Sequence, residues 1–484
     1  MYKRQTVSKK KFCAVINTIA VFVIQWCISV YCFENQNAMS NGDALVWISI
    51  VSDIAFLIHL LTWKKLTGEF LTPYIIFLTV LFVFTCGQGI GWATGLDMGS
   101  KDMWDRVDHG ITKAVLAQGL SYSMLGITAF QIGAILGKKV NSSRASKWNE
   151  TEVLTAFRKI GKLMLIVCIP SFAAIMAQNL MAVANGGYAA YYVANQSRSV
   201  IMRLLSIFAD FYQPCLLVLL IAYKENKTKR NLIIGAMLID VVCSLYVGGR
   251  SGAVMTLLGI LLAYHYFVNA FSRKQSIIVA IIGYFGAGVL NAIADIRQVT
   301  NRGIGDMITA IAGSFSNVLG QFIGELGWNI TSICWTMILV PEIYPYRFGM
   351  SYLVSFVSWI PTAFFGEVHP AVVWGNLADW LQKAENMSYG PGYTMVAESY
   401  INFGYWGLVA LLVEGFIIVK IIGNIDRRGV HENYLGATFQ IIFIMTIMKS
   451  LIRSSTSVAM RNAFFVILPL YLLVKIALTR SKAK

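Results

Sequence analysis

The apolar residues of this chain occur in long blocks, and short polar segments separate the blocks. Most blocks are about 18 to 25 residues long, which as an α-helix covers the roughly 30 Å of hydrocarbon in a bilayer. Helices of soluble proteins are usually shorter. The pattern predicts an all-α, polytopic membrane protein with about twelve transmembrane helices, near residues 13–32, 44–63, 71–94, 113–136, 161–184, 201–223, 231–248, 252–269, 276–294, 402–422, 436–455 and 462–478.

One long segment interrupts the series of spans. It divides a single integral membrane domain into helices one to nine (1–294), the segment 295–401, and helices ten to twelve (402–484). The segment is rich in Trp, Phe, Ile and Tyr, and it lacks the polar composition of disordered chains. We therefore expect it to form short amphipathic or re-entrant helices at the membrane surface, with prolines at their ends.

Composition and charge give the spans an orientation. The sequence is 57% hydrophobic and 13% charged, with a net charge of +16. If the spans alternate from a cytoplasmic N-terminus, most Lys and Arg residues fall on the inner side. Both termini are then cytoplasmic, the first block is an uncleaved span, and segment 295–401 lies on the outer face of the cytoplasmic (inner) membrane. Basic clusters in the inner loops are explained by this rule and by anionic membrane lipids, so no nucleic acid partner is expected.

Motifs of soluble enzymes are absent from the sequence. It has no GxxxxGK[ST], no GxGxxG after a strand, no HExxH and no GxSxG. The eight cysteines form no CxxC pair and none has a histidine at metal-ligand spacing. We therefore expect no metal and no cofactor, no ATP-driven transport by this chain alone, and no cytoplasmic transfer from a nucleotide sugar.

A glycine-rich turn between spans seven and eight carries a cation at the predicted outer face. The turn reads GGRSG and contains Gly248, Gly249 and Arg250. Glycines let a backbone approach a ligand closely, and a guanidinium binds phosphate oxygens through two parallel N–H groups. The turn is therefore a candidate site for a phosphate or diphosphate. An arginine that extends to the headgroups beside a tight turn would give the same pattern.

Further cations lie on the predicted outer face, where Lys and Arg are normally depleted. Each could serve structure alone, but together they favour an anionic substrate. They are Arg297, Arg302 and Arg347 in the long segment, with Lys449, Arg453 and Arg461 near the last two spans. We predict that Arg297, Arg302 and Arg453 bind the diphosphate together with Arg250.

The segment YGPGYTMVAESYINFGYWG leads into span ten and places a carboxylate near the outer face. Gly390 and Gly392 form a tight loop before a helix that carries Glu398. Glu398 could accept a proton from a sugar hydroxyl, but a glutamate that pairs an arginine or caps a helix would look the same. His369 and Asp295 are the next candidates for the base.

These two regions resemble signature regions of the Wzy-type polymerases of O-antigen and capsular polysaccharide. The resemblance covers the architecture, and GGRSG and GPGYTMVAESYINFGYWG match by residue. It implies a membrane-embedded glycosyltransferase that joins repeat units on undecaprenyl diphosphate at the outer leaflet, within membrane lipids, and without a cofactor. A chain-length regulator and a flippase are the protein partners that it implies. It assigns site roles to Arg250, Gly390, Gly392, Glu398, Asn402 and Gly404.

Two other functions stay open from the sequence. A flippase or transporter also uses about twelve spans with both termini inside, and Asp53, Asp210 and Asp240 lie within predicted spans. However, no internal repeat is visible. A glycan ligase would use the same lipid carrier and would differ only in its acceptor.

Overall fold

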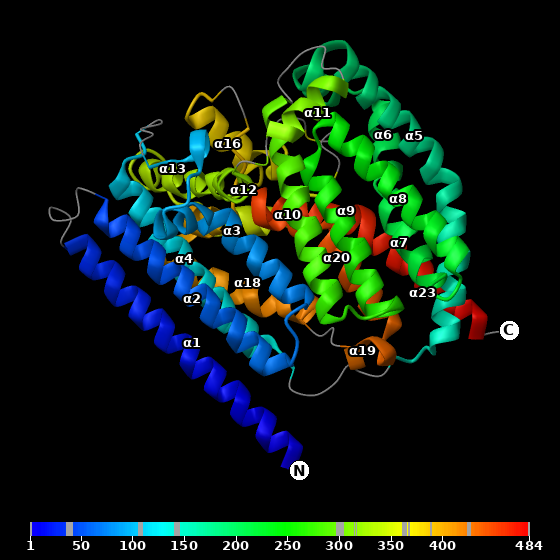
Figure 1. Cartoon of the computed structure of the whole chain (residues 1–484), viewed down its shortest axis with the longest axis horizontal. Helices are drawn as coiled ribbons and strands as arrows, with labels where there is room; N and C mark the ends of the chain where they lie inside the picture. Colours follow the sequence, from blue (N-terminus) through cyan, green and yellow to red (C-terminus); the bar gives the residue numbers. More distant parts are fainter. Residues whose placement is uncertain are drawn as a thin grey trace. The chain divides into compact units, whose positions relative to one another are not determined.

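A computed structural model describes residues 2–34, 42–104, 110–139, 146–296, 304–313, 315, 317–360, 365, 368–387, 390–423 and 427–482. Over these ranges the chain is helical and contains no strand (Figure 1). The all-α fold class predicted from the sequence is therefore confirmed.

Twelve helical stretches within the described ranges are long and apolar enough to cross a membrane. Every one overlaps a predicted span, and the largest difference is in the fifth, which begins at Glu150. The helices are α1 (Tyr2–Glu34), α2 (Asp43–Thr67), α3 (Pro73–Thr94), α4 (Lys113–Gly137), α5 (Glu150–Gln196), α6 and α7 (Val200–Ala209 and Tyr212–Ala222), α8 (Lys227–Val247), α9 with η2 (Arg250–Ala263 and Tyr264–Val268), α10 (Arg273–Ile296), α17, η7 and α18 (Met395–Phe403, Gly404–Trp406 and Gly407–Ile422), α20 and α21 (Tyr434–Thr446 and Met448–Arg453), and α22, η8 and α23 (Thr456–Asn462, Ala463–Ile467 and Leu468–Lys482).

Shorter helices lie between the spans, most of them in the long segment before span ten. Pro and Gly residues interrupt this segment, and its helices are too short to cross a membrane. The short helices are η1 (Gly99–Lys101), α11 (Ile304–Gly313), α12 (Val318–Gly327), η4 (Trp328–Ile330), α13 (Thr331–Leu339), α14 (Met350–Ser355), α15 (Pro370–Val373), α16 (Leu377–Ala384) and α19 (Arg427–Glu432).

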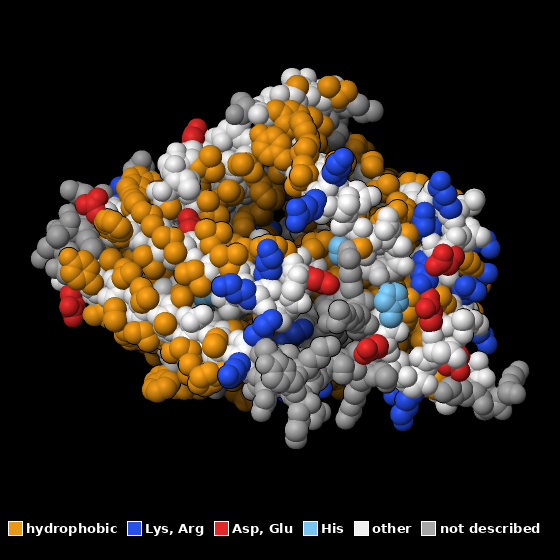
Figure 2. All heavy atoms as spheres, turned by 60° about the horizontal axis from the view of Figure 1, so that its bottom comes forward, with side chains coloured by type: hydrophobic (Ala, Val, Ile, Leu, Met, Phe, Trp, Pro, Cys, Tyr) orange, Lys and Arg blue, Asp and Glu red, His pale blue; other side chains and the backbone are white. Residues whose placement is uncertain are grey.

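The chain forms two compact units, and each draws on distant parts of the sequence. Unit 1 comprises residues 1–143, 323–426 and 447–461, and unit 2 comprises residues 144–322, 427–446 and 462–484. Hydrophobic side chains cover much of the surface in Figure 2, as expected for helices that contact lipid.

Unit 1 is built on the close packing of α4 against α18. Nearly all of α4 is buried. A Cβ on Gly133 would collide with the backbone carbonyl of Leu412, and a Cβ on Gly415 would collide with that of Phe130. Small residues let membrane helices approach backbone to backbone, and here they occur on both helices. Only glycine permits this contact at either position.

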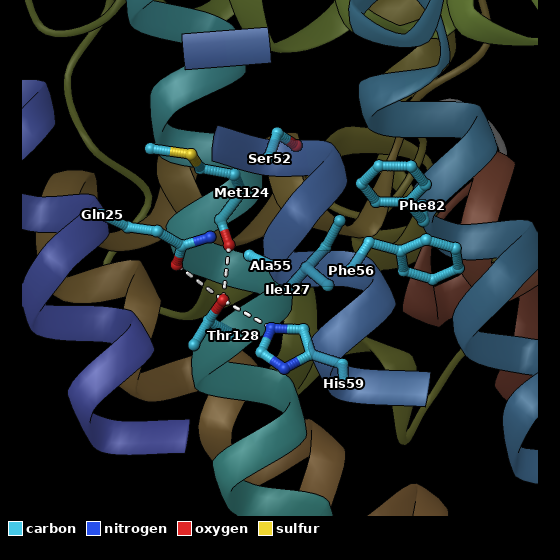
Figure 3. A pocket seen from close by; sticks show the side chains of 9 residues that line it. All are labelled: Gln25, Ser52, Ala55, Phe56, His59, Phe82, Met124, Ile127 and Thr128. Atoms are coloured by element: carbon cyan, nitrogen blue, oxygen red, sulfur yellow. Dashed lines mark hydrogen bonds between the residues drawn. The ribbon is translucent and has the colours of Figure 1, made fainter. Parts of the chain in front are cut away.

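Hydrogen bonds between side chains link α1, α2 and α4 within unit 1. The Thr128 hydroxyl donates to Gln25 Oε1 (2.7 Å) and lies 2.9 Å from His59 Nε2, which therefore donates to it (Figure 3). Tyr74 on α3 donates to Gln131 Oε1 at 2.6 Å. The small cavity beside Thr128 has no room for a water molecule. It is part of a packed polar contact between helices, which membrane proteins use for association, and not a ligand site.

Several helix ends of unit 1 with basic side chains come together at one end of the unit. Lys11 on α1 donates to two carbonyls at the end of α4, those of Leu136 (2.8 Å) and Lys138 (2.9 Å). Lys138 in turn donates to the Gly423 carbonyl after α18, and its ammonium lies 5.8 Å from the Trp63 ring on α2. Lys64 and Lys65 are in the last turn of α2. We call this the basic end of unit 1.

Unit 2 contains α5, the longest helix of the described residues. A capping box between Asn149 and Glu152 starts α5, and a kink at Gly186 and Gly187 interrupts it. Lys224 holds the start of α5 through an ion pair with Glu150 (2.5 Å) and donates to the Tyr434 hydroxyl on α20 (2.8 Å). These contacts fasten the lysine-rich segment after α7 to two neighbouring helices.

Candidate functional site

Glu398 lies on α17 and is completely buried. Its Oε1 accepts a hydrogen bond from the Ser351 hydroxyl on α14 (2.8 Å). Its Oε2 accepts from the backbone N–H (2.8 Å) and the hydroxyl (3.0 Å) of Thr456, the first residue of α22. The carboxylate therefore joins three helices that are distant in the sequence. The sequence left three roles open for this carboxylate, a base, a partner of an arginine and a helix cap, and its bond to the Thr456 N–H at the start of α22 is compatible with the cap.

Asn402 lies one turn after Glu398 and fixes the turn that precedes α14. Its amide nitrogen donates to the Ser351 hydroxyl and to the Glu398 carbonyl, both at 2.7 Å. Its amide oxygen accepts from the Gly349 N–H at 3.0 Å. Gly404 has a φ of 57° and packs against the Tyr346 ring, where a Cβ would be crowded. Asn402 thus positions Ser351, a partner of Glu398.

Arg347 is buried beside this cluster. Its guanidinium donates to the Trp374 carbonyl at 2.6 Å and lies 5.2 Å from the Trp380 ring centre. Burial lowers the pKa of the Arg347 guanidinium, and Tyr393 and Glu398 oppose that shift. An arginine stays charged despite such a shift, because its usual pKa is above 12. Arg347 therefore adds a fixed positive charge near Glu398.

Arg453 links the GPG loop to the end of α21. Its Nε donates to Asn329 Oδ1 at 3.1 Å, and its carbonyl accepts from the Tyr393 N–H at 3.0 Å. Gly392 has a φ of 74°, and a Cβ there would lie 3.4 Å from Arg453 Nε. Arg453 lies three residues before Thr456, which donates to the Glu398 carboxylate. Nothing lies within 4 Å of a Cβ on Gly390, so packing does not require a glycine there.

His369 caps α15 and is buried. Its Nδ1 accepts from the Ala371 N–H at 3.1 Å, which places the proton of the neutral ring on Nε2. Nε2 is buried and has no hydrogen-bond partner among the described residues. A Cβ on Gly375, shortly after α15, would touch the Ser457 hydroxyl, so this turn packs beside α22. In this tautomer His369 presents an N–H donor at Nε2. To act as a base through Nε2, the ring would need the tautomer with its proton on Nδ1.

The GGRSG turn belongs to unit 2. Gly248 ends α8 with a φ of 91°, and Gly249 precedes α9, which begins at Arg250. Arg250 is half-buried, and its Nη1 donates to the Leu290 carbonyl on α10 at 3.2 Å. Asp295 is in the last turn of α10, with its side chain outside the described residues. Arg297 and Arg302 also lie outside the described residues.

Unit 1 thus brings together seven of the predicted site residues. They are Glu398, His369, Arg453, Gly390, Gly392, Asn402 and Gly404. The roles assigned to them and to Gly248, Gly249, Arg250, Asp295, Arg297 and Arg302 stay predictions.

Comparison with known families decides the identity of the chain. The model of the family named O-antigen polysaccharide polymerase Wzy matches residues 15–484. The protein belongs to this family. No curated protein and no solved structure matched. The family assignment and the twelve apolar helices of the described ranges make it a multi-pass membrane protein.

The site of this Wzy family member includes groups that sequence reasoning missed. Ser351 and Thr456 carry no motif, and only the fold brings them to Glu398. Glu414 lies within span ten, and both of its carboxyl oxygens are buried. The buried Tyr352 hydroxyl lies beside Glu414, and Glu398 interacts electrostatically with both groups. An ionisable residue in the middle of an apolar span was the available signal for Glu414.

Proposed function

We propose that this protein joins oligosaccharide repeat units carried on undecaprenyl diphosphate at the outer leaflet of the cytoplasmic membrane. The observation that carries the proposal is that, in a family of O-antigen polymerases, the buried Glu398 carboxylate interacts electrostatically with Arg347 and accepts from Thr456, three residues after Arg453. A buried carboxylate and nearby cations suit a reaction that deprotonates a hydroxyl and releases a diphosphate.

The proposed reaction transfers the growing glycan to the next lipid-linked repeat unit. The acceptor hydroxyl oxygen forms a bond to the anomeric carbon of the donor, and the bond from that carbon to the diphosphate oxygen breaks. The diphosphate takes the bonding electron pair, and Glu398 takes the hydroxyl proton. Arg453 and the exposed Lys449 stabilise the charge on the diphosphate. Because the lipid diphosphate is the activated group, the reaction needs no nucleotide.

The hydrogen bonds of Glu398 set a condition for this mechanism. Its oxygens accept from Ser351 and Thr456, so an acceptor hydroxyl must displace or join one of these donors. The acceptor hydroxyl can displace Ser351 more easily than Thr456, because the Ser351 oxygen would keep the hydrogen bond that it accepts from Asn402. His369, with its proton on Nε2, suits a donor to the diphosphate better than a base.

We infer the membrane orientation from the basic end of unit 1 and the positive-inside rule. Tyr122 on α4 lies 2.9 Å from the Ser399 hydroxyl, next to Glu398. Lys138, at the basic end, is about 24 Å further along α4 at 1.5 Å per residue. By this rule the basic end and the N-terminus are expected to be cytoplasmic, with the site toward the outer face. An even number of spans, twelve as predicted from the sequence, would put the C-terminus on the cytoplasmic side as well. A topology reporter fused after residue 340 should be active only outside, and the reverse result would contradict this orientation.

Deletion of the gene tests the function directly. We expect the ladder of polymerised glycan to disappear from a gel while a single repeat unit is retained. Loss of all surface glycan would instead indicate a flippase. Accumulation of polymer on the lipid carrier would indicate a ligase. Either of these results would overturn the proposed polymerase.

Replacing Arg250 by lysine should lower polymer output sharply without lowering the amount of protein. The substitution Arg250→Lys keeps the charge but loses the two parallel N–H groups that bind phosphate oxygens. The control is Arg273→Lys, at an exposed arginine that begins α10. Polymer length is read from the glycan gel and protein from membranes. Wild-type polymer from Arg250→Lys would exclude a phosphate-binding role that depends on the guanidinium.

A further inference from the structure

The segment 348–359, which contains α14, has an inverted distribution of polar and apolar side chains. Its apolar side chains are exposed, with 76% of Phe348, 61% of Leu353 and 68% of Phe356 accessible. Its serines point inward and are buried. Ser351 donates to Glu398, and Ser355 donates to the Ser351 carbonyl at 2.8 Å. A segment surrounded by water has the opposite pattern, because exposed apolar surface is unfavourable there.

Hydrogen bonds place this segment alongside span ten. The Arg347 and Phe348 N–H groups donate to the carbonyls of Ile401 (2.9 Å) and Asn402 (3.0 Å) on α17. Tyr352 stacks on Phe403, with ring centres 6.2 Å apart. Because α17 begins a helical stretch that is long and apolar enough to cross a membrane, the segment lies beside one end of that stretch.

Backbone N–H groups of the segment donate to carbonyls within the protein. The N–H groups of Leu353, Phe356 and Ser358 donate to carbonyls three or four residues earlier. The Trp359 indole N–H donates to the Phe356 carbonyl at 2.9 Å. Backbone groups inside a bilayer must be satisfied internally, because no water reaches them. These N–H groups meet this requirement, although the segment is too short to cross the membrane.

The same unit also carries an exposed apolar stripe along α18. Along α18, exposed aliphatic side chains recur every four residues and so form one stripe. At the end of α18 nearest α14, Tyr405 and Trp406 are exposed, as aromatic residues are at a membrane interface. The stripe consists of Val409, Val413, Ile417 and Ile421.

We propose that segment 348–359 dips into the membrane leaflet on the site side of unit 1, with Phe348, Leu353 and Phe356 in contact with phospholipid acyl chains. In this arrangement α14 alone separates Glu398 from the lipid, since Ser351 and Leu353 occupy opposite faces of the helix. The inference concerns membrane contact and does not depend on the proposed reaction.

Photo-crosslinking of the full-length protein tests the inference. The crosslinking amino acid p-benzoylphenylalanine replaces Phe356 or, in a second variant, Leu353. Each protein is placed in nanodiscs of phosphatidylethanolamine and phosphatidylglycerol without polyprenyl lipid, and adducts are identified by mass spectrometry. Val413 is the positive control on the lipid-facing stripe, and the exposed Lys383 on α16 is the negative control.

We expect phospholipid adducts at 356 and 353 with yields within about threefold of the yield at 413, and none at 383. Yields as low as at 383 would overturn the proposal, because the segment would then face water. Adducts that form only after undecaprenyl phosphate is added would also overturn it, since the surface would be specific for a polyprenyl chain. If the variant at one of these two positions does not fold, the variant at the other position still tests the proposal.

Discussion

Replacing Gly133 or Gly415 by alanine is expected to reduce the amount of folded protein in the membrane by more than tenfold. A Cβ at either position would collide with a backbone carbonyl of the facing helix, so α4 and α18 would have to separate. Overpacking against side chains costs about 1 to 3 kcal/mol, and backbone cannot move aside as a side chain can. Native proteins are stable by only about 5 to 15 kcal/mol. The measurement is the yield of monodisperse protein after detergent extraction.

Gly235→Ala on α8 is the matched control, because no atom lies within 4 Å of a Cβ there. Alanine favours a helix over glycine by about 1 kcal/mol, so this substitution should be neutral or stabilising. The same change from glycine to alanine should therefore lower the stability of the protein at positions 133 and 415 but not at position 235. A wild-type yield from Gly133→Ala and Gly415→Ala would mean that α4 and α18 do not pack this closely.

Glu398→Ala and Glu398→Gln are both expected to lose polymerase activity, but for different reasons. Alanine leaves the Ser351 hydroxyl and both Thr456 donors without an acceptor, at about 1 to 3 kcal/mol for each buried group. Folded protein should therefore decrease markedly. Glutamine can keep its carbonyl oxygen on Thr456 and turn its amide toward the Ser351 oxygen, so Glu398→Gln should fold. It cannot take a proton, and turnover should fall by about 10² to 10⁴.

Polymerisation of purified lipid-linked repeat units separates these effects when folded protein is measured in parallel. Glu342→Gln serves as the control, because Glu342 is an exposed glutamate of the same unit. Near-normal turnover by folded Glu398→Gln would exclude the base role and leave Glu398 as a structural tie between α14, α17 and α22. Loss of both folding and turnover in Glu398→Gln would point to the structural role alone.

The sequence by itself determined the membrane spans of the described ranges. Each span is a run of neighbouring residues, and transfer of such a run into hydrocarbon depends on its own side chains and backbone hydrogen bonds. The same local information identified the GPG loop and the GGRSG turn, because glycine at positive φ is a property of one residue. Gly392 and Gly248 do have positive φ in the structure.

Only the tertiary structure decided which groups meet at the site. Glu398 accepts from Ser351, 47 residues before it, and from Thr456, 58 residues after it. Serine and threonine have no distinctive spacing along the chain, so no sequence pattern marks these contacts. The membrane limits each helix to one crossing, but which helices lie side by side depends on how their surfaces pack. The contact between α4 and α18 is of this kind, since Gly133 and Gly415 find their complementary backbones only in the folded unit.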